Sequence, residues 1–163
     1  MLLDLQDVSK SYPTGEGVLQ VLRGVSLSLD AGESLALTGE SGSGKSTLLH
    51  LAGGLDRPDS GAILFEGRDI AGLDDKELAA FRRVRVGLVF QQFNLIPSLD
   101  VAANLAFQAR LGGRFDAAWM ARLTARLGLE RLLDRYPEQL SGGQQQRVAI
   151  GRALAGRPQL ILA

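Results

Sequence analysis

The residues best suited to chemistry lie in one run of small and polar side chains, Gly39–Thr47, which reads Gly-Glu-Ser-Gly-Ser-Gly-Lys-Ser-Thr. Glycines let a backbone curl until successive N–H groups point inward, and an ammonium group beside them adds positive charge. A loop of this kind suits phosphate oxygens. The chain has only three lysines, Lys10, Lys45 and Lys76, so the one inside the glycine-rich run is notable.

The run matches the Walker A pattern, GxxxxGK[ST], and lies between the elements that this motif requires. Apolar residues predict a short strand over Glu33–Thr38, and the following pattern predicts a helix over Lys45–Ala52. The free N–H groups and positive dipole end of that helix favour an anion. We expect Lys45 to neutralise phosphate charge and Ser46 to place its hydroxyl on Mg²⁺. The predicted contact residues are Gly39, Ser41, Gly42, Ser43, Gly44, Lys45, Ser46 and Thr47. A flexible loop before a helix, without a ligand, is the alternative.

A second run, Leu140–Arg147, reads Leu-Ser-Gly-Gly-Gln-Gln-Gln-Arg and opens another predicted helix, Gly142–Leu154. Taken alone, Ser-Gly-Gly before a helix is an ordinary N-cap. Beside a Walker A loop, it resembles the signature sequence of ATP-binding cassette (ABC) ATPases. The resemblance implies that this helix N-terminus binds the γ-phosphate of an ATP held by a partner's Walker A loop. The residues concerned are Ser141, Gly142, Gly143 and Gln144.

Two further features resemble parts of the same family. Val89–Leu95 follows an apolar strand and resembles the glutamine loop, which implies that Gln91 reaches Mg²⁺ and the attacking water. The segment Phe93–Pro97 would then face a helical subdomain and a coupling helix of a membrane subunit, with plain core packing as the alternative. Tyr12 occupies the position of the family's adenine-stacking aromatic, where a π-face covers the base, with a surface tyrosine as the alternative.

The resemblance extends from Leu2 to Ala163, with four motifs in the family's order. It implies an α/β fold, in which the parallel sheet core of a P-loop NTPase (RecA-like) carries an N-terminal antiparallel β layer and a helical subdomain, incomplete at the C-terminus. The Gly54–Pro58 turn and the Phe90–Asn94 segment look most like lipoprotein-releasing and macrolide-export subunits. We expect the β layer and the P-loop core over 1–90 and a mainly helical subdomain over 91–140. The signature helix and the start of a strand are expected over 141–163.

Local patterns predict where the elements begin and end. Asp74, with Glu77 three residues on, forms a capping-box pattern, and Asp100 and Asp116 are predicted to cap two later helices. Gly128 is a predicted helix stop. The segments with apolar strand patterns are Leu3–Val8, Val25–Leu29, Ala62–Phe65, Val86–Phe90 and Leu160–Ala163.

Composition narrows the class of protein. The formal net charge is zero and the pI is about 6.6, so there is no global basic field for nucleic acid. The chain has no cysteine, and His50 is its single histidine, which excludes disulfides, thiolate metal sites and histidine clusters. No secretory leader and no membrane-spanning run are recognisable, and we expect a cytoplasmic protein.

The resemblance implies an ATP-binding subunit that uses ATP and Mg²⁺, forms a head-to-tail homodimer and acts on an integral membrane permease at the cytoplasmic face of the inner membrane. Leu160–Ala163 resembles the Walker B strand, but the aspartate and glutamate that follow it in the family are not in this sequence. We therefore expect a truncated chain that binds ATP and hydrolyses it poorly. The alternatives are a non-transport ABC ATPase of nucleic-acid repair or translation, and a non-catalytic nucleotide-binding fragment.

Overall fold

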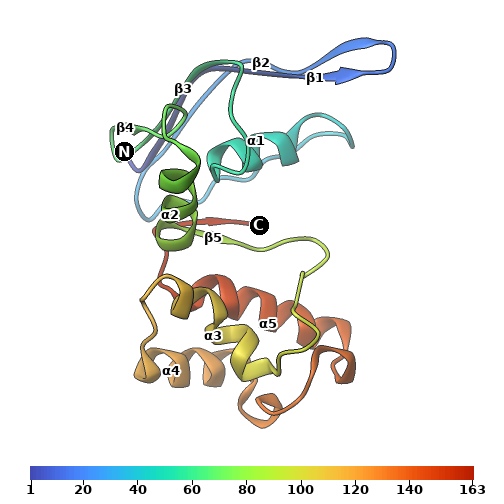
Figure 1. Cartoon of the computed structure of the whole chain (residues 1–163), viewed down its shortest axis with the longest axis vertical. Coiled ribbons are helices and arrows are strands. Elements are labelled where there is room, and N and C mark those ends of the chain that lie inside the picture. Colours follow the sequence, from blue (N-terminus) through green and yellow to red (C-terminus); the bar gives the residue numbers. More distant parts are fainter. The chain divides into compact units, whose positions relative to one another are not determined.

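The computed structural model describes all residues, Met1–Ala163, and the chain divides into two compact units, Met1–Ala79 and Ala80–Ala163 (Figure 1). Each unit has its own sheet and its own helices. The boundary falls within helix α2 (Asp75–Arg85). The division of the chain into 1–90, 91–140 and 141–163 stays a prediction.

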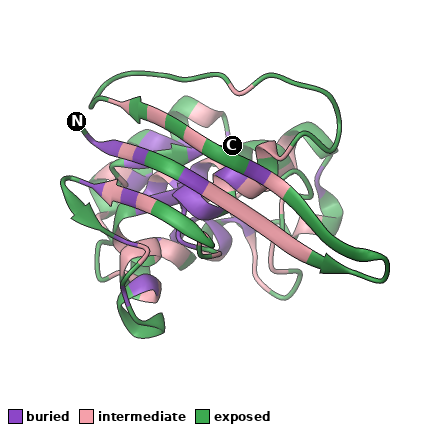
Figure 2. Cartoon of the chain, turned by 90° about the horizontal axis from the view of Figure 1, so that it is seen from above, coloured by how far each residue is buried: buried purple, intermediate pink, exposed green.

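The first unit has an antiparallel sheet with strand order β2-β1-β3-β4. Leu3, Leu5 and Val8 are buried on β1 and form much of its core, as the apolar pattern predicts. In Figure 2 the buried residues of β1 lie toward its N-terminal end, and the β1–β2 hairpin tip is exposed. The strands are β1 (Leu3–Thr14), β2 (Gly17–Leu29), β3 (Ser60–Phe65) and β4 (Arg68–Asp69).

The predicted strand over Glu33–Thr38 is wrong, because this segment has no regular secondary structure and pairs with no strand of either sheet. Its apolar residues have strand propensity, but a strand is stabilised only when its N–H and C=O groups pair with a neighbour. Leu35 is accordingly 53% exposed. The helix predicted after this segment is confirmed, since α1 spans Lys45–Ala52.

The second unit contains helices packed around one apolar cluster and a two-stranded parallel sheet in which β5 pairs with β6. Val86 lies opposite Leu160, and Leu88 lies opposite Leu162. The fully buried residues Leu105 of α3 and Val148 of α5 belong to the cluster. The elements are β5 (Val86–Leu88), α3 (Val101–Leu111), α4 (Ala117–Leu127), η1 (Glu130–Leu132), η2 (Pro137–Gln139), α5 (Gly142–Ala155) and β6 (Leu160–Leu162).

The predicted helix ends are confirmed by their hydrogen bonds. Asp74 accepts from the Glu77 N–H at 2.8 Å, and the Glu77 carboxylate accepts from the Asp74 N–H at 3.1 Å. Asp100 and Asp116 each accept from a backbone N–H three residues on, at 2.7 and 3.0 Å. Gly128 ends α4 in the left-handed conformation, with φ of 64°.

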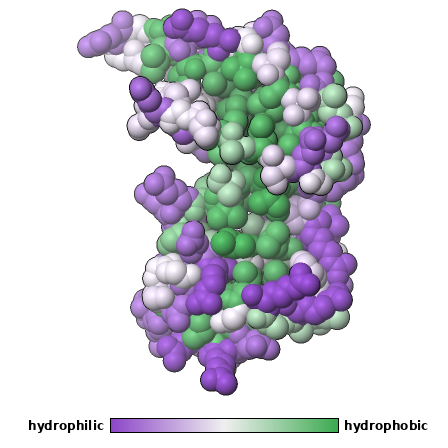
Figure 3. All heavy atoms as spheres, turned by 180° about the vertical axis from the view of Figure 1, so that it is seen from behind, coloured by the Kyte–Doolittle hydropathy of each residue, from purple (hydrophilic) through white to green (hydrophobic).

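The longest helix, α5, has 14 residues, and none of the helices combines the length and the apolarity that crossing a bilayer requires. On the face drawn in Figure 3, hydrophilic residues cover much of the lower part of the second unit, with hydrophobic side chains showing between them.

Candidate nucleotide-binding site

The Walker A run forms an irregular loop that turns directly into α1. Gly39, Gly42 and Gly44 all have positive φ, at 153°, 81° and 91°. L-residues with a Cβ adopt such angles at a cost, so glycine is needed for this path. At Gly44 space is limiting as well, because a Cβ there would lie 2.9 Å from the Leu22 Cδ2 atom.

The N-terminus of α1 has no cap of its own. Gly44 is the N-cap residue, no side chain accepts a hydrogen bond from the first turn, and that turn carries no acidic residue. The first N–H groups of a helix have no partner within the helix, and the positive dipole end lies beside them. Since no protein carboxylate occupies this position, it is free for an anion from outside.

Lys45 places its ammonium group within the same loop. Its Nζ donates to the Gly39 carbonyl oxygen at 2.8 Å, to the Glu40 carbonyl oxygen at 2.6 Å and to the Ser43 hydroxyl at 3.3 Å. These acceptors are neutral. Phosphate oxygens would be stronger, charge-assisted partners for the same group. The N–H groups of the helix start and this ammonium therefore fit a polyphosphate.

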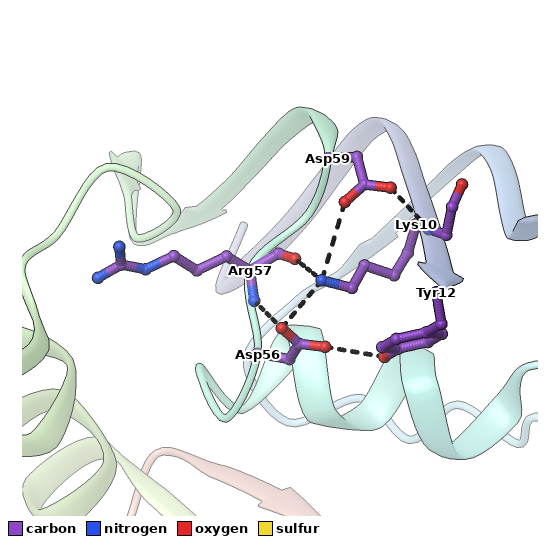
Figure 4. A network of polar contacts seen from close by, with 6 residues as sticks. Lys10, Tyr12, Asp56, Arg57 and Asp59 are labelled. Carbon is purple, nitrogen blue, oxygen red and sulfur yellow. Dashed lines mark hydrogen bonds and ion pairs between the residues drawn. The ribbon is translucent and has the colours of Figure 1, made fainter. Parts of the chain in front are cut away.

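Tyr12 lies half-buried on β1, and a polar network holds its hydroxyl (Figure 4). The phenol donates to the Asp56 carboxylate at 2.8 Å, and the same carboxylate accepts from Lys10 Nζ at 3.0 Å. The Lys10 ammonium also lies 5.1 Å from the centroid of the Tyr12 ring. Burial raises the pKa of Tyr12, the Asp56 hydrogen bond raises it further, and a hydrogen bond with Thr47 opposes both.

The pKa of Asp56 is shifted the other way. Burial is the largest single influence and would raise this pKa, but the hydrogen bonds from Lys10, Tyr12 and the Arg57 N–H together outweigh it and lower the pKa. Asp56 is therefore a carboxylate held in its ionised form by three donors. Local residue patterns predict only a turn at Asp56, because its partners on β1 lie more than forty residues away in the sequence.

Gln91 lies in an exposed turn that follows β5. The next residues have strained backbone, because Phe93 and Asn94 adopt φ of 59° and 47° without being glycine. Arg152 of α5 holds them by donating to the Phe93 carbonyl oxygen at 2.8 Å and the Asn94 carbonyl oxygen at 2.7 Å. Burial lowers the pKa of the Arg152 guanidinium.

Asn104 fixes the remainder of the same loop from α3. Its fully buried amide donates to the carbonyl oxygens of Ile96, Leu99 and Asp100 at 3.0, 2.8 and 3.1 Å, and accepts from the Ile96 N–H at 2.9 Å. Neither Asn104 nor Arg152 is among the residues predicted from the sequence. No sequence signal distinguishes them, because α3 also carries Gln108 and Arg110, and α5 also carries three glutamines and Arg147.

The signature run caps α5 with its own side chains. Ser141 Oγ accepts from the Gln144 N–H at 3.3 Å, and Gln144 Oε1 accepts from the Ser141 N–H at 2.8 Å. The N-cap interpretation is therefore confirmed, while the binding of a γ-phosphate stays a prediction. Gly142 and Gly143 are exposed, and a Cβ at either position would meet no atom within 4 Å. The packing of the chain itself does not require glycine there.

The predicted site residues are divided between the two units. The first unit holds the Walker A loop and Tyr12, and it brings Thr47 of that loop close enough to Tyr12 to influence the pKa of the phenol. Gln91 and the signature residues belong to the second unit.

Ser46 and Gln91, the predicted metal ligands, offer neutral oxygen atoms, which suit a hard cation such as Mg²⁺. The chain has no group of three or more His, Cys, Asp or Glu side chains that could hold a metal ion. Ser46 and Gln91 belong to different units, and their roles as metal ligands stay predictions.

Comparison with known proteins also identifies the chain as similar to ABC transporter ATP-binding proteins. The family model described as ABC transporter matches residues 22–163. The chain is 47% identical over 165 residues to the lipoprotein-releasing system ATP-binding protein LolD of Geobacter metallireducens, which covers 99% of this chain and 73% of that protein. It is also 47% identical to the macrolide export ATP-binding/permease protein MacB of Shigella flexneri, covering 99% of this chain. The chain spans 26% of the length of that protein.

Solved structures agree. The dimeric structure of MJ0796, a bacterial ABC transporter cassette, superposes with a TM-score of 0.91 at 41% identity, covering 99% of this chain and 73% of that one. A post-hydrolysis state of the same cassette, bound to ADP and Pi, gives a TM-score of 0.89. The predicted likeness to lipoprotein-releasing and macrolide-export subunits is confirmed. The chain belongs to the ABC transporter family and has the P-loop fold of its ATPase cassettes.

Proposed function

We propose that this chain binds ATP through the Walker A loop, as the nucleotide-binding part of a transporter ATPase. The observation that carries the proposal is the start of α1, where an uncapped helix N-terminus, a left-handed Gly44 and the Lys45 ammonium come together. The ADP and Pi bound to the similar cassette support a nucleotide as the ligand.

The test is ATP binding by the purified chain, measured by calorimetry. Lys45→Ala removes a charge-assisted contact and is expected to weaken binding roughly 10- to 100-fold. Lys76→Ala is the matched control, because Lys76 is an exposed lysine in the first turn of α2, outside the loop. Equal affinities for the Lys45→Ala and Lys76→Ala chains would contradict the proposal, as would a wild-type chain that does not bind.

Mg²⁺ is the proposed companion of the nucleotide. Bound with ATP, the cation supplies charge neutralisation at the phosphate oxygens. In this chain the Ser46 hydroxyl would hold it, with the Gln91 amide as the second protein ligand. Gln91 is neutral and cannot take a proton from water, so for this polypeptide we propose ATP binding with little turnover. Phosphate release clearly above that of Lys45→Ala would contradict this part.

We further propose a head-to-tail dimer in which Ser141–Gln144 of one copy contacts the nucleotide held by the other. This dimer drives transport through a membrane permease, at the cytoplasmic face of the membrane. The dimeric state of the similar cassette supports the pairing, and the words "ATP-binding/permease protein" in the names of relatives support the partner. Light scattering with and without Mg·ATP tests the first part, and an unchanged monomer at saturating nucleotide would contradict it.

A further inference from the structure

One polar network of the first unit joins β1 to the turn that follows α1, more than forty residues later in the sequence (Figure 4). Lys10 and Tyr12 project from β1, Asp56 follows α1, and Thr47 belongs to α1 itself. Residues two apart on a strand share a face, so Lys10 and Tyr12 point toward the same partners. The Asp56 carboxylate lies between them, with one oxygen 2.8 Å from the Tyr12 hydroxyl and the other 3.0 Å from the Lys10 ammonium.

We propose that Asp56 is a positioning residue for base recognition: its carboxylate fixes the Tyr12 ring beside the phosphate loop helix, where the ring stacks on the adenine of bound ATP. This inference rests on the proposed function. Asp56 itself does not contact the nucleotide. It acts through the aromatic side chain that it holds.

The Lys10 ammonium is held at one place, which makes it a fixed support for the ring. Besides Asp56, its Nζ donates to the Arg57 carbonyl oxygen at 2.7 Å and lies 3.8 Å from the Asp59 carboxylate. The Lys10 side chain is only 12% exposed. A cation at 5.1 Å from the ring centroid attracts the ring, and the half-buried ring keeps part of its surface accessible for a base.

Thr47 links this network to the phosphate site. Thr47 lies close enough to Tyr12 to influence the pKa of the phenol, and it belongs to the first turn of α1, whose N-terminus is the proposed anion site. The Asp56 hydrogen bond therefore holds the Tyr12 hydroxyl in the neighbourhood of this first turn. Without the Asp56 hydrogen bond, the Tyr12 ring would still offer an aromatic surface for stacking, but it would no longer be held in one orientation.

The test separates the base from the phosphates by comparing ATP with inorganic triphosphate, each as its magnesium complex, on the full chain. Asp56→Asn and Tyr12→Phe are each expected to weaken ATP binding about 3- to 10-fold. This loss is smaller than that expected from removing the aromatic ring altogether. Triphosphate binding is expected to stay unchanged. The double variant is expected to be no weaker than either single one, because both changes remove the same tether.

Asp75→Asn is the matched control, since Asp75 is an aspartate of the same unit that pairs with Arg57 and does not contact Tyr12. A second readout is the titration of Tyr12 by ultraviolet absorbance, because removing the Asp56 carboxylate lowers a phenol pKa that this carboxylate helps to raise.

Three results would overturn the inference. An Asp56→Asn chain that binds ATP like wild type shows that the ring needs no tether. Equal losses for ATP and triphosphate show that Asp56 only stabilises the fold of the loop. A wild-type chain that binds triphosphate and ATP equally well shows that no base platform exists, while leaving the phosphate site intact. Failure of the wild-type chain to bind either ligand would instead overturn the proposed function itself.

Discussion

Helices α1 and α5 both begin with glycines at a proposed phosphate contact, yet their N-termini are built differently. The N-cap of α1 is Gly44, in the left-handed conformation and without any side-chain hydrogen bond. The N-cap of α5 is Ser141, in an extended conformation and with a complete capping box from Gln144. One helix start therefore lacks a partner for its N–H groups, whereas the other supplies its own.

The difference indicates which helix N-terminus binds nucleotide first. At α1 a ligand meets backbone N–H groups that no side chain has satisfied. At α5 a ligand would compete with Ser141 and Gln144 for the same N–H groups, or use those that remain. We therefore expect α1 to bind nucleotide in the single chain, and α5 to contribute only when a second copy presents the phosphate.

The largest expected effect is that of a single methyl group at the α1 start. Gly44→Ala combines a left-handed residue with contacts to Leu22 and Val21, and should lower the free energy of unfolding by about 2–4 kcal/mol and abolish ATP binding. Gly143→Ala, in open space at the α5 start, should be neutral or slightly stabilising. Urea denaturation of both variants measures the free energy of unfolding. Equal losses of stability in the two variants would contradict the difference between the α1 and α5 starts.

Nucleotide itself should separate the two helix starts. At a concentration of 100 times its Kd, ATP is expected to stabilise the first unit by about 2.7 kcal/mol. Amide hydrogen exchange should then slow in 39–48 and stay unchanged in 141–148 of the monomeric chain. Protection of both segments at low protein concentration would show that α5 binds nucleotide without a partner, contrary to the comparison.

Removal of the α5 cap should have a smaller effect. Ser141→Ala removes the hydroxyl that accepts from the Gln144 N–H, and is expected to lower the free energy of unfolding by about 1 kcal/mol. Urea denaturation measures this loss, with Gln146→Ala, an exposed position of the same helix, as the control. Equal stability of the Ser141→Ala and Gln146→Ala chains would mean that the capping box contributes nothing.

The smallest expected effect concerns pH and the turn that follows α1. Because the folded chain lowers the pKa of Asp56, its carboxylate stabilises the fold above the usual aspartate pKa of about 3.9. This contribution is lost as the pH falls through the lowered value. Denaturation between about pH 5 and pH 2 should therefore show a steeper loss for wild type than for Asp56→Asn. Parallel curves would show that Asp56 is not held by its donors.

Local signals in the sequence predict most of the elements. Residues that cap a helix N-terminus accept a hydrogen bond from the residue three positions on, so Asp74, Asp100, Asp116 and Ser141 could be identified without knowledge of the fold. Glu33–Thr38 shows the limit of such signals. Its apolar residues predict a strand, but whether a strand forms depends on a partner elsewhere in the chain, which no local pattern reveals.

The site was predictable to the same extent. The Walker A loop and the signature run are contiguous in the sequence, and their backbone geometry follows from their own glycines and capping residues. The residues that hold the site together act over long distances in the sequence. Asp56 reaches Tyr12, and Arg152 reaches the glutamine loop, only because the fold brings their segments together. Such contacts have no spacing rule.

The contact of Arg152 with Phe93 and Asn94 has a mechanical consequence. Because α5 is one uninterrupted helix, its N-cap Ser141 and its last turn are the two ends of a rod, with Arg152 about 16 Å from the cap. A shift of the rod along its axis moves both ends by the same distance. The carbonyl oxygens of Phe93 and Asn94, which are hydrogen-bonded to Arg152, would move with the helix. A displacement of the Ser141 end of α5 would therefore also displace the loop that contains Gln91.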